Sequence, residues 1–514
     1  MSTSKEMQMP TKQFSNYESL ITFTRASGGH ALRPVSYGDE LVTNGTFDTD
    51  LSGWTDDNSQ WAVSGSRAYH ASNNVFGTLR QSLSVTTGNV YKITFDYEVT
   101  QGELRCQARD SSNSPNNGSL NITDLTGTGS ASVIFVPDAD FDSIAFARDD
   151  IGVASEMYVD NVSVKEVFFD ESDGTLTLFE HPENVPRVEW DSAGNRLGLL
   201  VEEARTNLIS YSEDLSVWDK NNVSVGANTD ASPDGAITAD TVNFTLGLGA
   251  HIAKTQSSVV SSGDQIVASI HLKGISGQTA RLVLGTGGGT YQAITEDLVF
   301  DGSWQRFSIG PLTLSDVKVF VGLYVDNQGG SKTVTSVAAW GGQIEQGAFP
   351  TSYIKTTGST ATRSADVASI PVADFGYNQS AGTFVSEFQA KASLGTIGNF
   401  MTVFAASDNT TSNRIRANST QGLEVAVSGI AQANLSSSFT ANFEHKYASA
   451  YKENDFAFSQ DGGTASTDTS GTVPAVTQVE FGRFLTGRDM TGHIKSIKYY
   501  PRRLTNAQLQ DITS

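Results

Sequence analysis

The chain has very little cysteine. Among its 514 residues Cys106 is the single one, so no disulfide can form within the chain. This excludes a small secreted domain stapled by disulfides and allows assembly in a reducing cytoplasm. Cys106 lies in the run ELRCQAR, which has the pattern of a strand, and we expect it to be a small buried residue.

Basic side chains are also scarce. The chain carries 34 Lys and Arg against 56 Asp and Glu, a formal net charge of −22. A surface of this sign repels phosphate groups, so neither nucleic acid nor an anionic membrane is an expected partner. The acidity favours solubility, which is its simplest interpretation, and it also leaves carboxylates for divalent cations.

Long apolar runs are missing. No stretch approaches 18 uninterrupted apolar residues, and residues 1–20 have no apolar core of signal-peptide length. We therefore expect neither membrane insertion nor ordinary secretion, and release by cell lysis satisfies both expectations. Residues 1–39 are interpreted as an attachment arm, whose polar first part is disordered or becomes ordered against a partner.

The motifs of common catalytic centres are missing as well. GTGGGT (285–290) has neither dinucleotide-loop spacing nor a P-loop lysine, and it is predicted to be a turn. The seven histidines show no HExxH or HxH spacing, and no GxSxG elbow occurs. The adjacent pairs Asp149–Asp150 and Glu202–Glu203 would point to opposite faces of a strand, unlike the carboxylates of a glycosidase. The sequence predicts a protein that is not an enzyme.

Short β-type runs fill the chain instead. Its 48 glycines, with Ser, Thr and Asn, recur about every ten residues between runs of Val, Ile, Phe and Tyr. This punctuation is typical of β-sandwiches, and 514 residues require more than one core. The expected fold class is all-β: three β-sandwich modules in series with one short C-terminal helix.

Two stretches frame the middle of the chain. They are GLLVEEARTNLISYSEDLSVW (198–218) and WGGQIEQGAFPTSYIKTTGSTATRSAD (340–366). They resemble an opening motif, GLLxExxRTNLxxxSE, and a closing motif, WGxQxExGxxxTSYIxTxGxxxTRxAD, that bracket a module common in bacteriophage virion proteins. The resemblance implies a carbohydrate-binding-like β-sandwich at 200–368. It indicates a class of protein and leaves the ligand open.

A further module is predicted before this one. ITFTRASGGHALRP (21–34) resembles the FTRAS stretch of the same phage proteins, but its usual continuation, PRVEWDSAGNRLGLLVEE, comes only at 186–203. We infer that residues 40–166 are an insertion into the N-terminal region of the central module, followed by a linker at 167–199. Its ends, ELVTNGTFDTDLSGWT and EMYVDNVSVKEV, resemble jelly-roll carbohydrate-binding modules of families four and nine. In a jelly roll the first and last strands pair, so the two ends of the insertion are expected to lie together.

The last module is expected at 369–514. Its ending, FGRFLTGRDMTGHIKSIKYYPRRLTNAQLQDITS, resembles that of concanavalin A-like (laminin G-like) domains, with a last strand followed by a short helix. Thr505 and Gln508 have the spacing of a capping box, and Leu504 and Leu509 occupy the flanking staple positions.

Calcium is the one metal considered. In the jelly-roll families resembled above, a structural Ca²⁺ joins the end strands. That resemblance implies Asp160 as a ligand, with Asp48 and Asn44 as further ligands. The alternative is that Asp160 caps a bulge. No other cofactor is predicted.

Glycan binding needs exposed aromatic rings beside polar side chains. In the first module Trp61, Tyr69 and Arg105 are the candidates, and in the second Tyr291 and Trp304, with Trp218 considered beside them. Trp54 and Trp340 belong to the framing motifs and are expected to be core residues instead.

The resulting hypothesis is a phage virion structural protein, a fibre or spike subunit that binds host-surface polysaccharide without catalysis. Its localisation would be the virion, its partners other virion proteins contacted through the N-terminal arm, and its state a homo-oligomer, with a trimer assumed by analogy. The alternatives are a purely architectural capsid or tail decoration protein and a secreted glycan-degrading enzyme.

Overall fold

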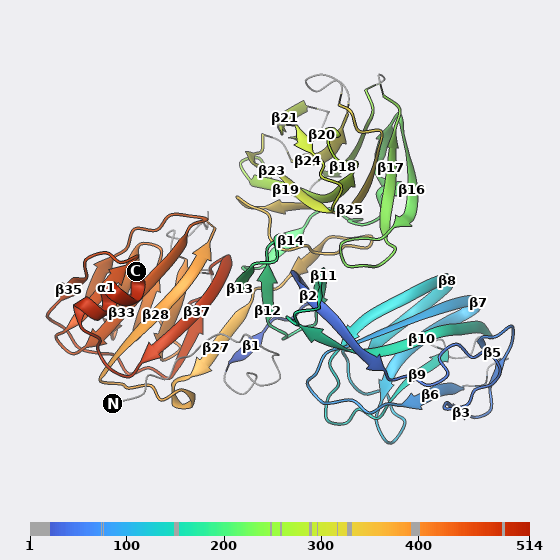
Figure 1. Cartoon of the computed structure of the whole chain (residues 1–514), viewed down its shortest axis with the longest axis horizontal. Helices are drawn as coiled ribbons and strands as arrows, with labels where there is room; N and C mark the ends of the chain where they lie inside the picture. Colours follow the sequence, from blue (N-terminus) through green and yellow to red (C-terminus); the bar gives the residue numbers. More distant parts are fainter. Residues whose placement is uncertain are drawn as a thin grey trace.

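The computed structural model describes residues 21–514 except for 73–74, 76, 149–153, 247–248, 258–259, 287–289, 296, 316, 326–331, 392–400 and 486–488. Within these residues the fold is all-β, with antiparallel sheets and the short helix α1 (Asn506–Thr513). Figure 1 shows three lobes that meet at a central junction. Among the described residues, no helix has the length and apolarity needed to cross a bilayer.

The first lobe, here called the insert module, encloses an apolar core that includes Phe95, Leu104 and Phe146, each at most 1% exposed. Cys106 belongs to this core, and burial raises the pKa of its thiol. The strands of the lobe are β3 (Thr55–Asp57), β4 (Trp61–Val63), β5 (Ala68–Ser72), β6 (Thr78–Ser82), β7 (Tyr91–Arg109), β8 (Asn121–Phe135), β9 (Ser143–Arg148) and β10 (Ser155–Phe169).

The two ends of the insert module lie side by side, as the jelly-roll resemblance implied. Strand β2 (Gly29–Glu40) pairs with the end of β10, where Lys165 is opposite Glu40. The Leu41 amide donates to the Val164 carbonyl at 3.0 Å. Beyond the module, β2 continues toward the junction and pairs with β11 (Thr175–His181). The expected linker at 167–199 therefore contains the end of β10, β11 and further strands.

The second lobe, the central module, is a sandwich of two antiparallel sheets ordered β15-β18-β24-β20-β21 and β16-β17-β25-β19-β23. Leu282 and Val321 of one sheet and Ile270 and Val337 of the other fill the shared core. The strands are β14 (Arg205–Asn207), β15 (Asp219–Asn221), β16 (Val223–Asp230), β17 (Ala239–Phe244), β18 (His251–Ser257), β19 (Gln265–Gly274), β20 (Thr279–Thr286), β21 (Thr290–Ile294), β22 (Leu298–Val299), β23 (Gln305–Thr313), β24 (Lys318–Tyr324), β25 (Ser336–Gln346) and β26 (Ala361–Arg363).

The third lobe, the C-terminal module, consists of two seven-stranded sheets ordered β1-β27-β36-β29-β30-β31-β32 and β12-β13-β37-β28-β33-β34-β35. Its strands are β1 (Thr22–Thr24), β12 (Arg187–Trp190), β13 (Arg196–Val201), β27 (Val367–Pro371), β28 (Ala381–Ala390), β29 (Thr402–Ser407), β30 (Arg414–Asn418), β31 (Gln421–Val427), β32 (Ile430–Ser436), β33 (Glu444–Lys452), β34 (Phe456–Gln460), β35 (Ser466–Asp468), β36 (Gln478–Phe481) and β37 (Gly492–Tyr500).

This module is assembled from three separate parts of the chain, which differs from the expected boundaries. Strand β1, from the expected N-terminal arm, pairs with β27, and β13, which crosses the expected boundary between the linker and the central module, pairs with β37. Phe23, Leu199 and Val201 join the core between the two sheets. The run RLGLLV is almost wholly apolar because β13 lies against this core, which explains a pattern unlike that of a linker.

Helix α1 forms as the sequence predicted. The Thr505 side chain accepts from the Gln508 amide at 3.3 Å, and the Gln508 side chain accepts from the Thr505 amide at 2.9 Å. Leu504 and Leu509 are 3% and 0% exposed and pack on the outer face of the β28–β33–β34 sheet. The capping box and the apolar contact thus fix the end of the chain on the third lobe.

The packing of Gly342 on Trp218 joins the closing motif to the opening motif and can be tested. A Cβ at position 342 would lie 2.6 Å from the Trp218 ring. We expect Gly342→Ala to lower the Tm of the central module by several degrees in calorimetry, since overpacking costs about 1–3 kcal/mol. Gly226→Ala is the control, because the nearest atom to its Cβ would be the Thr229 methyl carbon at 3.3 Å, 0.7 Å further than the Trp218 ring is from a Cβ at position 342. Equal Tm values for the two variants would contradict the account.

Candidate functional site

Five charged side chains lie buried where the three lobes meet. This junction cluster consists of Arg25, Arg187, Glu202, Arg363 and Asp366, and each side chain is at most 3% exposed. Every member comes from one of the motifs noted in the sequence: FTRAS, PRVEW, GLLVEE or TRSAD. The cluster therefore brings together segments that are up to 341 positions apart in the chain.

Asp366 is the common acceptor of the junction cluster. One carboxylate oxygen accepts from the Arg25 guanidinium at 3.2 Å, and the other accepts from Arg187 and from the Glu202 backbone amide, the latter at 2.9 Å. The Asp366 amide in turn donates to the Glu202 carbonyl at 2.9 Å. The start of the C-terminal module is thereby bonded to the opening motif of the central module.

Glu202 is equally well bonded. Its carboxylate accepts from the amide and the hydroxyl of Ser352 at 2.8 and 2.7 Å, and it forms ion pairs with Arg187 at 2.9 Å and Arg363 at 3.4 Å. Burial alone would raise the pKa of Glu202, but the two guanidinium groups and the Ser352 hydrogen bonds outweigh it and hold that pKa well below its usual range. Burial, together with neighbouring Arg187, lowers the pKa of Arg25 to about 10.

Other polar residues of the two framing motifs are used in the same way. Asn207 is fully buried; its amide donates to the carbonyls of Gly342 and Ile354 and accepts from the amides of Ile209 and Ile344. The Tyr353 hydroxyl bonds with Ser212 at 2.7 Å and donates to Glu213 at 3.0 Å. These hydrogen bonds join the opening and closing motifs within the central module, and their polar atoms face one another and not an open site.

A more exposed group of planar and charged side chains lies on the insert module. In β10, Tyr158 is opposite Tyr69 of β5 on one side and Glu98 of β7 on the other. The Tyr69 and Tyr158 ring centroids are 4.7 Å apart, and the Arg67 guanidinium lies 4.0 Å from the Tyr158 ring centroid. We call Arg67, Tyr69, Glu98, Glu156 and Tyr158 the tyrosine face.

Hydrogen bonds and ion pairs order the tyrosine face. Arg67 pairs with Glu98 at 2.6 Å, and these two side chains remain 34% and 33% exposed. The Tyr69 hydroxyl donates to Glu156 at 3.3 Å. The face thus offers closely packed flat groups beside carboxylates that accept hydrogen bonds, in the partly exposed setting that a sugar ring requires.

Of the glycan-binding candidates, Tyr69 alone lies on the tyrosine face. Trp61 is 6% exposed, packs against His70 and donates from its indole to the Gly77 carbonyl, so it cannot stack on a sugar. Arg105 lies further along β7, opposite Ala147 of β9, on other strands than Tyr69. Trp61 and Tyr69 point to opposite faces of the β4–β5 hairpin. Trp61 is opposite His70, and Tyr69 precedes His70 in the same strand, so its side chain points to the other face.

Of the central module's candidates, the structure describes the side chains of Trp304 and Trp218 but not that of Tyr291. Trp304 is half-buried between this module and β11, and its indole donates to the Ala231 carbonyl at 2.9 Å. Trp218 is 3% exposed. Trp54 and Trp340, which the sequence assigned to the core, are 8% and 0% exposed. Tyr291 lies in β21, but its side chain is outside the described part of the structure.

Tyr158 is the residue that the sequence interpretation missed. It stands two positions before Asp160 in MYVDNV, so strand alternation places both on the same outer face. Glu156 and Tyr158 alternate with buried Met157 and Val159, and this period of two is the signal that could have identified Tyr158. The resemblance of EMYVDNVSVKEV to jelly-roll carbohydrate-binding modules drew attention to the aspartate instead.

Each of the three calcium candidates has a hydrogen-bond partner of its own in the structure. Asp160 accepts from the Asn161 amide at 2.8 Å in a β-bulge of β10, as the alternative interpretation proposed. The Asn44 side-chain amide donates to the carbonyls of Asp50 and Ser52, and Asp48 accepts from Thr46 at 3.0 Å. Burial raises the pKa of Asp160, as do Asp96 and Asp48. Among the residues described, no group of three His, Cys, Asp or Glu could hold a metal ion.

Glu202 lies in the junction cluster and Glu203 pairs with Arg205. Asp149 and Asp150 are outside the described residues.

No model of a known protein family matches the chain, and no curated protein matches it. Among solved structures, it is similar to one described as "CBM4 structure and function", with 18% identity and a TM-score of 0.22 over 24% of this chain and 99% of that one. It is also similar to the CBM22-1–CBM22-2 tandem domain of Xyn10C from Paenibacillus barcinonensis, with 10% identity and a TM-score of 0.23 over 60% of this chain and 98% of that one.

A third similar structure is the sialidase of Trypanosoma rangeli in complex with the inhibitor DANA. It is 10% identical, with a TM-score of 0.23 over 94% of both chains. TM-scores of this size describe a faint likeness, from which neither the fold nor the function of this chain follows.

The junction cluster predicts that neutralising Glu202 lowers the stability of the protein more than neutralising Glu203, which lies outside the cluster. Glu202→Gln should cost about 3–5 kcal/mol, because it leaves the buried Arg187 and Arg363 charges without their partner. Glu203→Gln is the matched control, since the partly exposed Glu203–Arg205 pair is worth about 1 kcal/mol or less. Calorimetry of the full chain measures both as falls in Tm.

The lowered pKa of Glu202 also predicts that the stability difference between the wild type and Glu202→Gln depends on pH. The folded-state pKa of Glu202 is lowered, so its contribution to stability is present above its unfolded pKa of about 4.3 and is lost as pH falls below it. The Tm difference between the wild type and Glu202→Gln should be constant near neutral pH and shrink below roughly pH 4. A difference that grows on acidification, or equal falls for both Glu variants, would contradict this role.

The arrangement of Asp160, Asp48 and Asn44 predicts that calcium does not stabilise the insert module. We expect the Tm of the full chain to be the same in excess EDTA and in millimolar CaCl₂. Asp160→Asn provides the control for any nonspecific effect of the ion. A calcium-dependent rise in Tm that Asp160→Asn abolishes would show that these oxygens rearrange into a site.

Proposed function

We propose that the chain is a phage virion structural protein that binds host-surface glycans through the tyrosine face and performs no catalysis. The tyrosine face is the observation that carries the glycan-binding part. The resemblance of the framing motifs to those of phage virion proteins supports the virion part, and the resemblance of the insert module's ends to carbohydrate-binding modules agrees with the location of the face.

The chemistry of the tyrosine face fits a sugar ring. The C–H face of a sugar can pack on the flat surface of Tyr69 and Arg67, while its hydroxyl groups donate to Glu98 and Glu156 and accept from Arg67. The existing Arg67–Glu98 and Tyr69–Glu156 contacts hold these groups in place, so little side-chain entropy is lost when a ligand binds.

A single face of this size binds weakly, so several copies acting together would supply the strength of attachment. On a homo-oligomer such as a fibre, simultaneous contacts raise the effective affinity without any new type of contact. Under this proposal residues 1–20, which are outside the described part, attach the chain to other virion proteins.

The test is binding of the purified full chain to a glycan array and to labelled host cells. Tyr69→Ala should weaken binding about tenfold, equivalent to about 1.4 kcal/mol, whereas Tyr69→Phe keeps the ring and should stay close to the wild type. Phe443→Ala is the control, because Phe443 is an exposed aromatic residue, at 63%, on the C-terminal module.

Three outcomes would overturn parts of the proposal. No binding by folded wild-type protein would favour a purely architectural decoration role. Equal binding by wild type and Tyr69→Ala would place the glycan elsewhere. Release of reducing sugar from host polysaccharide would show an enzyme.

A further inference from the structure

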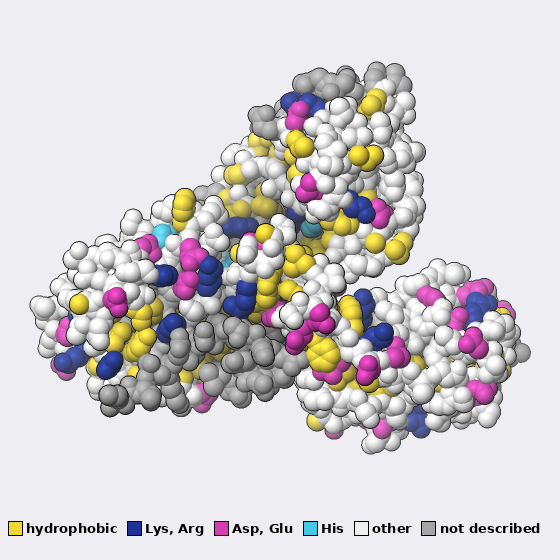
Figure 2. Space-filling model, in the orientation of Figure 1, with side chains coloured by type: hydrophobic (Ala, Val, Ile, Leu, Met, Phe, Trp, Pro, Cys, Tyr) yellow, Lys and Arg dark blue, Asp and Glu magenta, His cyan; other side chains and the backbone are white. Residues whose placement is uncertain are grey.

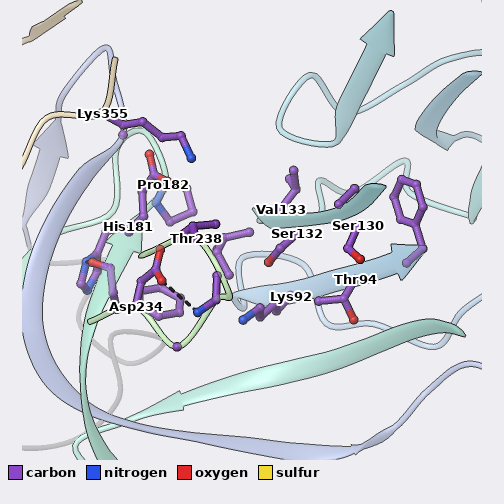
Figure 3. A pocket seen from close by; sticks show the side chains of 18 of the residues that line it. Lys92, Thr94, Ser130, Ser132, Val133, His181, Pro182, Asp234, Thr238 and Lys355 are labelled. Carbon is purple, nitrogen blue, oxygen red and sulfur yellow. Dashed lines mark hydrogen bonds between the residues drawn. The ribbon is translucent and has the colours of Figure 1, made fainter. Parts of the chain in front are cut away.

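A cleft of about 1200 Å³ lies between the insert module and the central module. One wall is formed by β7 and β8 of the insert module, and the other by residues 234–238 of the central module together with Lys355 and the end of β11. Figure 3 shows Lys92, Thr94, Ser130 and Ser132 on one side of the cleft, facing the side of Asp234 and Thr238.

The first wall continues directly from the tyrosine face. Along the β7–β8 ladder, Glu98 is opposite Thr128, Asp96 opposite Ser130, and Thr94 opposite Ser132. Successive pairs on one face of a sheet are about 6.8 Å apart, so the polar surface extends about 14 Å from Glu98 to Thr94. Asp96 and Ser130 line the cleft and adjoin the tyrosine face, so the two surfaces are continuous.

The second wall is held in a fixed position. The Leu178 amide of β11 donates to the Pro233 carbonyl at 3.1 Å, and the Trp304 indole donates to the Ala231 carbonyl at 2.9 Å. The Trp340 indole donates to the Thr238 hydroxyl at 3.1 Å. Bonds from both ends of the loop to buried or half-buried groups mean that the cleft exists before any ligand binds.

The cleft has a mixed polar and apolar lining, and its charged side chains are mostly acidic. Four carboxylates contribute to it against two lysines: Asp96, Glu180, Glu183 and Asp234 against Lys92 and Lys355. Lys355 is paired with Glu213 at 2.8 Å, so its charge is already balanced. In Figure 2 acidic and basic side chains both border the place where the insert lobe joins the rest. An anionic ligand would be repelled, whereas hydroxyl groups find donors and acceptors in Thr94, Ser130 and Ser132.

From this geometry we propose that the cleft is the continuation of the glycan site, which holds the remainder of a neutral oligosaccharide whose first rings lie on the tyrosine face. The proposal rests on the proposed function and adds two points to it. The preferred ligand is an uncharged chain long enough to pass from Tyr69 into the cleft. The central module, through the loop at 234–238, contributes to specificity.

The experiment measures the affinity of the full chain for printed ladders of neutral oligosaccharides, from disaccharide to octasaccharide, beside a ladder of anionic uronate oligosaccharides. Ser132→Arg blocks the cleft from an exposed strand position. Thr126→Arg is the matched control, because it is an exposed threonine on the same strand outside the cleft. A second blocking variant, Ile237→Arg, acts from the opposite wall, where Ile237 is 63% exposed.

For the wild type and Thr126→Arg we expect affinity to rise with chain length through the octasaccharide. For both blocking variants we expect disaccharide binding as in the wild type and at least fivefold weaker octasaccharide binding. Wild-type affinity for octasaccharide in both blocking variants, or a preference for the anionic ladder, would overturn the cleft proposal while leaving the tyrosine face intact. Tyr69→Ala should weaken binding about tenfold at every chain length, whereas the blocking variants weaken only the longer chains, and this difference separates the tyrosine face from the cleft. Failure of the wild type to bind any ladder would overturn both proposals.

Discussion

The arrangement of the three lobes depends on the buried ion pairs of the junction cluster. Removing charged groups from water is costly, and the cost is offset here because the Arg25, Arg187 and Arg363 guanidinium groups surround the Glu202 and Asp366 carboxylates. Removing any one member would leave its charged partners unpaired in an apolar environment. The segments that carry these residues must therefore fold together, although other modules separate them in the sequence.

This constraint determines the geometry of the candidate glycan site. Strands β2 and β11 run from the junction to the insert module, and β11 is hydrogen-bonded to the central-module loop that forms one wall of the cleft. The insert module is therefore held at a set position relative to the central module. The insert module, whose ends are joined by β2 and β10, contributes the tyrosine face. The central module contributes the opposite wall of the cleft.

Much of the fold could be predicted from the sequence, but the strand partners could not. The turn spacing indicated the all-β class, and the spacing of Thr505 and Gln508 predicted the capped helix. The pairing of β1 with β27 and of β13 with β37 depends on long-range contacts that no local pattern records. Of the tyrosine face, the sequence interpretation named Tyr69 but not Tyr158, and the Trp61 that it also named lies on the buried side of its strand. A single sequence shows which residues can stack on a sugar, and pairing decides which of them face solvent.

The central claim is that one continuous surface, from the tyrosine face into the cleft, binds a neutral glycan. A crystal structure of the full chain with the tightest neutral oligosaccharide from the array tests it most directly. The account predicts a sugar ring against Tyr69 and Arg67, with the following rings between Ser132 and Thr238. A glycan bound on the C-terminal module or on the outer face of the central sandwich, with the tyrosine face empty, would contradict it.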